Sequence, residues 1–265
     1  ANRYAKLLPQ LDLNKAIETT KIYNAHGFQT DGLIEAAPLR KPHLSLSAAA
    51  FVGGGSSVKP GEVSLAHNGV LFLDEMTEFS KHTLEQLRQI LENKSIEILR
   101  VKESQKYPAD FLLLAACNPC PCGYLGDQDT NCRCSQPQIE KYLGKLSGPL
   151  LDRIDIHLRL TKLQAETLKL LGKNTKENYG TKEMLEKINE AKTFAKDNKL
   201  DLELDKDAEG FMEKAIYNLK LSARSHTKII KLARTIANLD RSLKIKKEHL
   251  TEALQYRSVN WSNYS

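Results

Sequence analysis

Residues 69–75 read Gly-Val-Leu-Phe-Leu-Asp-Glu, a continuous apolar run that ends in two adjacent carboxylates. A short apolar run without polar alternation is typical of a parallel strand that is covered on both faces. Residues 111–116 form a second run of this kind. The segment between them predicts a helix, with Ser80 as N-cap and an apolar face formed by Leu84, Leu87, Ile90 and Leu91. This order predicts a right-handed crossover and a doubly wound parallel α/β sheet.

The rest of the chain predicts insertions in this core and a separate helical part. We expect the core to span residues 1–160, with inserted hairpins at about 44–68 and 95–110. Glycine and proline interrupt the first of these segments, and apolar and charged residues alternate in the second. The polar segment 161–181 is predicted to be a linker. Residues 182–265 contain four amphipathic helical patterns, which predict a small all-α lid.

Composition and charge exclude some classes of protein. The 265 residues include 39 Lys and Arg and 33 Asp and Glu, and the whole excess of +6 lies in residues 161–265. This excess permits contact with a polyanion, although a solvated helical surface is the better explanation for most of these lysines. A membrane span is excluded because no apolar run approaches 18 residues. Since no export signal is visible, we expect a cytoplasmic protein without membrane contact.

Three polar side chains follow the two predicted strands. Asp74 and Glu75 would lie at the carboxyl edge of the sheet, where open α/β folds bind their ligands. One acid there is suited to holding Mg²⁺ through water, and its neighbour to activating the attacking water. Asn118 follows the next strand and could hydrogen-bond that water or a phosphate. The alternatives are an acidic helix start and an Asn-Pro turn.

Two arginines also occur where a phosphate would explain them. Arg153 lies between two aspartates in an apolar run, which predicts either an internal ion pair or a guanidinium offered to a neighbouring subunit's phosphate. Arg224 follows Ser222, the predicted N-cap of a helix. A basic side chain in the first turn opposes the helix dipole, and a nearby anion would resolve that mismatch.

The five cysteines all lie between Cys117 and Cys134. Four of them form two C-x-C pairs separated by nine residues, namely Cys120 with Cys122 and Cys132 with Cys134. Two such pairs are able to form a tetrahedral Zn²⁺ site, although C-x₂-C is the more usual spacing. Buried apolar cysteines and free thiols are the alternatives. Because the residues between the pairs are polar, we favour a zinc-bound loop over residues 117–134, with Cys117 in the core.

These motifs resemble the magnesium-chelatase-like AAA+ ATPases of the ComM/YifB type over nearly the whole chain. The matching stretches are Lys-Pro-His (41–43), Ser-Leu-Ser-Ala-Ala-Ala (45–50), Val-Gly-Gly-Gly (52–55), Pro-Gly-Glu-Val-Ser-Leu-Ala-His-Asn-Gly (60–69) with the strand and acids that follow, Asn-Pro-Cys-Pro-Cys-Gly (118–123) and Leu-Ser-Gly-Pro-Leu-Leu-Asp-Arg-Ile-Asp (146–155). The resemblance implies an AAA+ core with a helical lid that uses ATP and Mg²⁺ in a ring, expected to be a hexamer. It also implies the residue roles, with Asp74 and Glu75 as the Walker B acids, Asn118 as sensor 1, Arg153 as arginine finger and Arg224 as sensor 2.

The sequence departs from this family at one important motif. The phosphate-binding loop, G-x-x-x-x-G-K-[ST], does not occur in the chain. Residues 1–5 resemble the helix that begins just after that loop, so we expect an N-terminally truncated core. The resemblance then implies that the whole protein hydrolyses ATP, whereas this fragment binds ATP weakly or not at all.

The sequence indicates the substrate of the motor less clearly than it indicates the fold and the ATPase residues. The inserted segments offer basic side chains for a DNA backbone that is bound without sequence preference. These are Arg40, Lys41, Lys59, Lys94, Arg100, Lys102 and Lys106. A solvated hairpin surface is the alternative. The resemblance implies a DNA helicase or branch-migration ATPase in recombination during natural transformation. The two alternatives are a chelatase-type motor subunit and a non-enzymatic, zinc-stabilised binding module.

Overall fold

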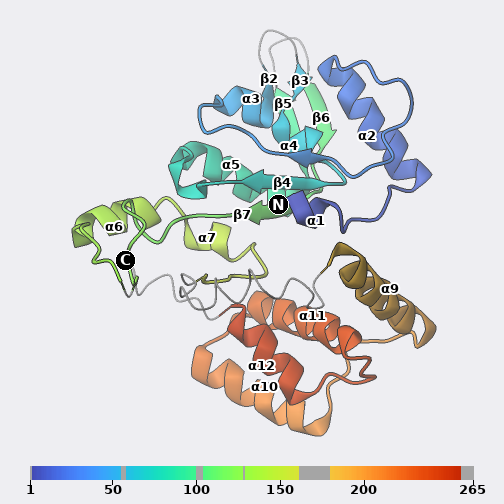
Figure 1. Ribbon diagram of the computed structural model, residues 1–265, viewed down its shortest axis with the longest axis vertical. Helices are drawn as coiled ribbons and strands as arrows, with labels where there is room; N and C mark the ends of the chain where they lie inside the picture. The colour runs from blue at the N-terminus through green and yellow to red at the C-terminus, as the bar shows by residue number, and fades with distance from the viewer. Residues whose placement is uncertain (1, 55–57, 100–103, 128, 161–179, 258–265) are drawn as a thin grey trace. The chain divides into compact units, whose positions relative to one another are not determined.

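A computed structural model describes residues 2–54, 58–99, 104–127, 129–160 and 180–257 of the chain. The chain divides into two compact units, Ala1–Arg153 and Ile154–Asn260, each of which is described here by itself. Figure 1 shows a sheet with helices in the first unit and helices in the second. Among the described residues, none of the helices combines the length and the apolar composition that crossing a lipid bilayer requires.

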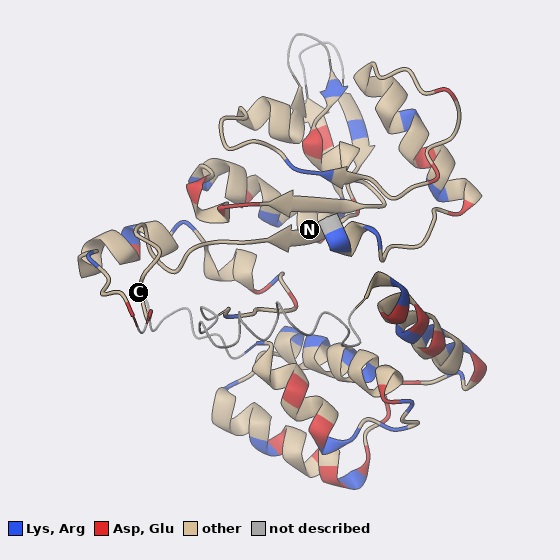
Figure 2. Ribbon diagram, in the orientation of Figure 1, with Lys and Arg blue, Asp and Glu red and all other residues tan. Residues whose placement is uncertain are grey.

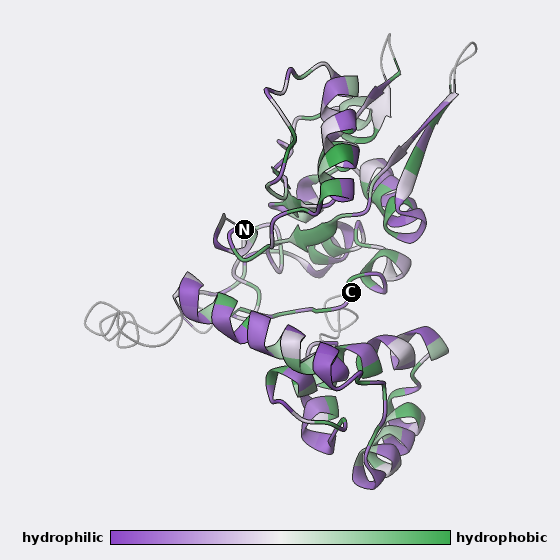
Figure 3. Cartoon of the chain, turned by 90° about the vertical axis from the view of Figure 1, so that its right-hand side faces the viewer, coloured by the Kyte–Doolittle hydropathy of each residue, from purple (hydrophilic) through white to green (hydrophobic). Residues whose placement is uncertain are grey.

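The centre of the first unit is a three-stranded parallel sheet with the order β1-β4-β7. Its strands are β1 (Leu39–Arg40), β4 (Val70–Leu73) and β7 (Leu112–Ala115). β4 pairs with β7 from Val70 opposite Leu112 to Leu73 opposite Ala115. Val70, Leu71 and Leu73 are fully buried, as expected for a strand covered on both faces, and Figure 3 shows the hydrophobic colour in the central sheet. The two predicted strands and their parallel pairing are therefore confirmed, although β7 is exposed or half-buried rather than covered on both faces.

Helices surround this sheet. They are α1 (Asn2–Ala5), α2 (Leu13–His26), α3 (Ala48–Val52), α4 (Glu62–Leu65), α5 (Lys81–Asn93), α6 (Gln136–Leu143) and α7 (Gly148–Leu151), with the 3-10 helix η1 (Met76–Glu78) after β4. α5 is the predicted crossover helix. Ser80 caps it by accepting a hydrogen bond from the Thr83 amide at 3.1 Å. Leu84 and Leu87 are buried as their spacing predicted, whereas Leu91 is only half-buried.

Two antiparallel hairpins lie next to each other in the first unit (Figure 1). One consists of β2 (Gly53–Gly54) and β3 (Lys59–Pro60), and the other of β5 (Ser95–Leu99) and β6 (Ser104–Pro108). The hydroxyl of Tyr107 on β6 donates a 2.8 Å hydrogen bond to the carbonyl of Val58, just before β3. These hairpins occupy the two segments in which the sequence predicted insertions.

The second unit is helical. Its helices are α9 (Thr181–Asp197), α10 (Lys206–Leu219), α11 (Ala223–Leu239) and α12 (Lys247–Gln255). Ile229, Ala233, Ile245 and Leu250 are fully buried in its core. The unit begins at Ile154 rather than at the predicted end of the α/β core at residue 160. Most of the predicted linker, residues 161–179, lies outside the described residues.

Candidate functional site

The two predicted acids follow β4 in a tight turn. Asp74 and Glu75 are both exposed, and Asp74 accepts a 3.2 Å hydrogen bond from the Glu75 amide through Oδ1. Glu75 has left-handed backbone angles, φ 49° and ψ 48°. Such a conformation costs a non-glycine residue roughly 1 kcal/mol or more, and residues held in it cluster at functional sites. The turn therefore presents both carboxylates to solvent at the edge where the buried strand ends, and Figure 2 shows the acidic colour on the chain directly after β4.

Backbone hydrogen bonds tie this turn to the end of β7. The Ala116 amide donates to the Leu73 carbonyl at 2.9 Å, and the Met76 amide donates to the Ala116 carbonyl at 2.8 Å. Asn118, which is exposed, lies two residues after Ala116. Asp74, Glu75 and Asn118 thus follow the carboxyl ends of two paired parallel strands, which is the edge at which open α/β folds bind their ligands. Their individual roles stay predictions.

Buried and half-buried residues contact the segment that follows this turn, and the sequence analysis did not identify them. Thr77 in η1 is fully buried, and its carbonyl accepts a 2.7 Å hydrogen bond from Nζ of Lys145, which follows α6. Tyr142 of α6 is also buried. Burial raises the pKa of its phenol, the neighbouring Thr77 hydroxyl opposes that shift, and the charges of Glu78, Cys117 and, least of all, Glu75 add to it. No spacing rule predicts these contacts because the partners lie more than 60 residues apart.

Arg153 makes an internal ion pair in this structure. It follows α7, its side chain is only 11 % exposed, and its guanidinium contacts the Glu92 carboxylate of α5 and the Pro149 carbonyl. The internal pair was one of the two alternatives that the sequence offered, and Glu92 is a partner in it. A role as arginine finger stays a prediction, and it requires that the guanidinium leave Glu92.

Arg224 lies in the second unit, in the exposed first turn of α11. The Ser222 side chain accepts a 3.2 Å hydrogen bond from the Ser225 amide, so the predicted N-cap is confirmed. Arg224 therefore stands where the positive end of the helix dipole lies. Its role as sensor 2 stays a prediction.

Of the basic residues proposed to contact DNA, Arg40 is partly buried in an ion pair, some others are exposed, and the rest lie outside the described residues. The Arg40 guanidinium makes two hydrogen bonds of 2.7 and 2.6 Å to the Glu62 carboxylate, and 27 % of its side chain is exposed. That carboxylate also raises the pKa of Arg40. The pair therefore connects β1 to α4, and a DNA contact by Arg40 stays a prediction.

The remaining basic residues are exposed or lie outside the described part of the chain. Lys94 pairs with Asp110 at 2.9 Å in a solvated ion pair, and Lys41 lies over the Phe72 ring. Lys59 and Lys106 are exposed on the two adjacent hairpins, and Figure 2 shows the basic colour on β3 and β6. Arg100 and Lys102 lie outside the described residues.

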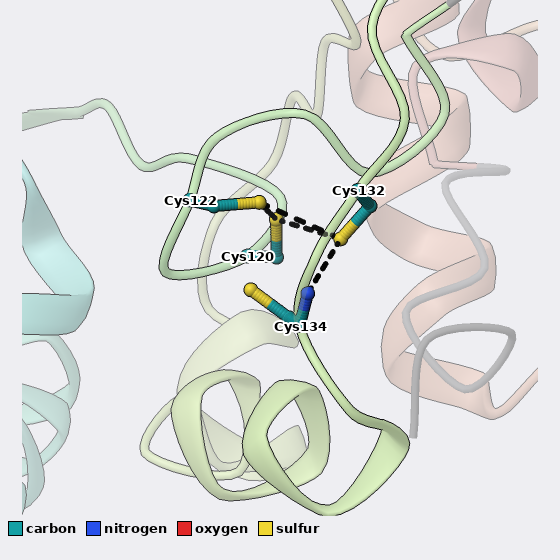
Figure 4. Close-up of side chains that lie close together, drawn as sticks. All are labelled: Cys120, Cys122, Cys132 and Cys134. Atoms are coloured by element: carbon teal, nitrogen blue, oxygen red, sulfur yellow. Dashed lines mark hydrogen bonds between the residues drawn. The ribbon is translucent and has the colours of Figure 1, made fainter.

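The two cysteine pairs converge after β7, as Figure 4 shows. The four sulfur atoms of Cys120, Cys122, Cys132 and Cys134 lie within 4.8 Å of one another, and this cluster could hold a metal ion. Cys120 is fully buried and the other three are half-buried. Cys117 lies outside the cluster, where burial raises the pKa of its thiol.

The thiols of this cluster differ in acidity. Backbone amides of Tyr124 and Arg133 donate towards the Cys122 sulfur, which lowers the pKa of that thiol to about 6. For Cys132, the amide of Cys134 lowers the pKa, but desolvation and the sulfurs of Cys122 and Cys120 outweigh it and raise the pKa to about 12. Four thiolates at such short separations repel one another, and a dication is the usual way in which proteins balance that charge.

Comparison with known proteins places this chain in a family. The family profile described as "Magnesium chelatase, subunit ChlI" matches residues 1–168, and the profile described as "Magnesium chelatase, subunit ChlI C-terminal" matches residues 174–257. The chain is 40% identical to competence protein ComM of Haemophilus influenzae and 38% identical to the uncharacterized protein YifB of Escherichia coli. Each match covers 98% of this chain and 53% of the relative, so the chain spans about half the length of these relatives. The chain therefore belongs to the magnesium chelatase ChlI family, in agreement with the resemblance found in its motifs.

Proposed function

We propose that the whole protein is an ATP-driven ring motor that acts on DNA, and that this chain contributes the acids and the amide of its ATPase site. The observation that supports this most directly is the exit of Asp74, Glu75 and Asn118 from the carboxyl ends of the paired strands β4 and β7. Family membership supports an ATPase motor subunit in general. The DNA substrate and the assembly into a ring go beyond what family membership supports, and they are proposed here.

The residues at this edge fit Mg²⁺–ATP. Mg²⁺ prefers carboxylate and water oxygens, and Asp74 offers an exposed carboxylate there. When bound, Mg²⁺–ATP would supply the terminal phosphoryl group and neutralise the charge that develops on it. Glu75 would accept the proton of the attacking water, and Asn118 would orient that water or the terminal phosphate. In a ring, Arg153 would extend this site into the neighbouring subunit's nucleotide.

The edge of β7 that pairs with no described strand is where a strand that carries the phosphate-binding loop could pair with the sheet. Within the described residues, β7 pairs with β4 on one side and with no strand on the other. Leu112 on this strand is 43 % exposed, although an apolar strand edge is usually paired or covered. We propose that a strand from another part of the whole protein pairs here and places its phosphate-binding loop beside Asp74 and Glu75.

The intact protein and this chain should differ in a direct test. We expect the intact protein to hydrolyse ATP with Mg²⁺, and the 265-residue chain alone to show neither hydrolysis nor micromolar ATP affinity, because it lacks the amide cradle and lysine for the phosphates. Phosphate release and isothermal titration measure the two quantities. Micromolar binding by the chain, or an intact protein without ATPase activity, would contradict the proposal.

The adjacent hairpins are the proposed DNA contact. Lys59 and Lys106 are exposed on β3 and β6, and the name of the Haemophilus relative, a competence protein, supports a DNA substrate. We expect the double variant Lys59→Ala, Lys106→Ala to weaken binding of branched DNA to the intact protein equally across sequences. The slope of log affinity against log salt should fall by about 2, one for each lost phosphate contact.

A matched variant controls for net charge. Lys182→Ala with Lys192→Ala removes the same charge from exposed positions on α9, and its salt slope should stay that of the unaltered protein. Equal slopes for both variants would exclude the hairpins as the DNA contact. The family description favours a second candidate, a chelatase-type motor subunit, and ATP hydrolysis that needs a porphyrin-pathway partner while ignoring DNA would support it.

A further inference from the structure

We propose that Cys120, Cys122, Cys132 and Cys134 bind one Zn²⁺ ion, and that this ion positions Asn118 and the turn after Glu75. The metal site is independent of the proposed ATPase activity. Only its consequence for turnover rests on that proposed function.

Three of the four sulfurs are spaced nearly as they would be around a single tetrahedral ion, and all four lie within 4.8 Å of one another. The sulfur of Cys120 lies 3.4 Å from that of Cys122 and 3.6 Å from that of Cys132, and Cys122 lies 3.5 Å from Cys132. Tetrahedral coordination with Zn–S distances of about 2.3 Å separates neighbouring sulfurs by about 3.8 Å. A disulfide would instead require about 2.05 Å. In Figure 4 the side chains from both C-x-C pairs point towards one centre.

The backbone around the sulfurs is shaped to hold thiolates. The Cys134 amide donates to the Cys132 sulfur at 3.5 Å, and amides of Tyr124 and Arg133 donate towards the Cys122 sulfur. Gly123 adopts φ 83°, which reverses the chain directly after the first pair. Hydrogen bonds from backbone amides to ligand sulfurs are the outer contacts that orient metal ligands.

The segment has little else to stabilise it. Between the end of β7 at Ala115 and the start of α6 at Gln136, the described residues form no helix or strand. The small core beneath them consists of Cys120 with Ile139, Tyr142 and Leu143 of α6, and the other three cysteines and Leu125 pack against it. Irregular segments of this length are uncommon in a compact domain unless something orders them. An ion bound by four thiolates would crosslink both ends of the segment to each other.

The chemistry of the ligands favours zinc. Four thiolates in a tetrahedron select Zn²⁺ or iron, and the close approach of all four sulfurs fits one ion rather than a cluster with several irons and sulfides. Zn²⁺ suits a closed structural site because it has no redox chemistry and no open coordination position when four cysteines bind it.

Contacts on both sides connect this site to the proposed ATPase residues. Asn118 lies two residues before Cys120. After the second pair, α6 places Tyr142 in the cysteine core, and Lys145 donates to the Thr77 carbonyl at 2.7 Å. Thr77 is two residues after Glu75. Fixing the cysteine segment therefore fixes both Asn118 and the support of the acidic turn, so the ion acts as a positioning element.

Metal analysis tests the site itself. We expect the intact protein, purified without chelator, to contain one zinc per chain by mass spectrometry. Cobalt exchanged into it should show the intense thiolate-to-metal and visible bands of a tetrahedral sulfur site.

Cys122→Ser and Cys134→Ser should lose the zinc, whereas Cys117→Ser, outside the cluster, should retain it. Less than a tenth of an equivalent of zinc, stoichiometric iron, or cobalt without these bands would overturn the proposal. The cobalt spectrum needs no variant, so it decides even if the serine variants fail to fold.

Steady-state kinetics test the positioning role. Lys145→Met leaves the four ligands in place but removes the contact to Thr77, so we expect full zinc content and a kcat for ATP about tenfold lower, with KM unchanged. Lys141→Met, an exposed position one turn earlier on α6, is the matched control and should keep kcat. Equal kcat values for both variants would overturn the positioning role. Zinc in a protein without ATPase activity would instead refute the proposed function and leave the metal site standing.

Discussion

Glu75→Gln lowers the ATP turnover of the intact protein by about 10²- to 10⁴-fold while nucleotide binding remains, if Glu75 accepts the proton of the attacking water. Glutamine keeps the size of the side chain and its hydrogen bonding, but it cannot take up a proton. Because the side chain is exposed in a turn, the change should not affect folding. Single-turnover hydrolysis and equilibrium binding of ATP measure the two effects separately.

Glu78 provides the control for this variant. It is an exposed carboxylate in η1, and its amide donates a 2.7 Å hydrogen bond to the Glu75 carbonyl. Glu78→Gln makes the same change of charge three residues further on and should leave turnover within about twofold of the unaltered protein, since no proton transfer depends on it. Equal rates for the two variants would remove Glu75 from the proposed mechanism.

Gly69→Ala is expected to have the largest effect on stability. A Cβ atom at Gly69 would lie 2.7 Å from the Pro38 nitrogen and closer still to the Pro38 carbonyl oxygen. That oxygen accepts the Val70 amide at 2.8 Å where β1 and β4 begin to pair, so neither backbone segment is able to move without loss of pairing. We expect the free energy of unfolding to fall by about 3 kcal/mol or more. Thermal unfolding of the 265-residue chain should then show a Tm lower by about 6–12 °C.

Gly32→Ala is the matched substitution for Gly69→Ala. A Cβ atom at Gly32 would meet nothing within 4 Å. Surface substitutions of this kind change stability by about 0.5 kcal/mol at most. If the two alanine variants unfolded at the same temperature, close backbone approach at Gly69 would not be what the glycine permits.

The elements that surround the site were predictable because their signals are local. The apolar run before Asp74 gives a buried strand whatever its neighbours are, and Ser80 caps α5 through the backbone three residues later. β1 was missed because two residues, Leu39 and Arg40, are too short to produce an apolar pattern. Its existence depends on pairing with β4, which lies 30 residues away along the chain.

The ion-pair partners of the charged side chains were not predictable either, because these contacts also join residues that are far apart in the sequence. Arg40 makes an ion pair with Glu62, a partner that the sequence did not indicate. Arg153 makes the internal ion pair that was one of its two alternatives, but the sequence did not indicate Glu92 as the partner. An ion pair forms between groups that the fold brings within a few ångströms, and sequence separation carries no information about that distance.

The amino-acid order alone determined the type of the main elements, the places of the acids and the amide at strand ends, and the presence of two cysteine pairs. Those features follow from backbone periodicity and from spacings of a few residues. Only the tertiary structure decided that the two cysteine pairs share one centre, that Lys145 supports the turn after Glu75, and that Arg40 and Arg153 are engaged by carboxylates. Each of these contacts joins residues that are far apart in the sequence. The packing of the whole unit determines which of its segments come into contact.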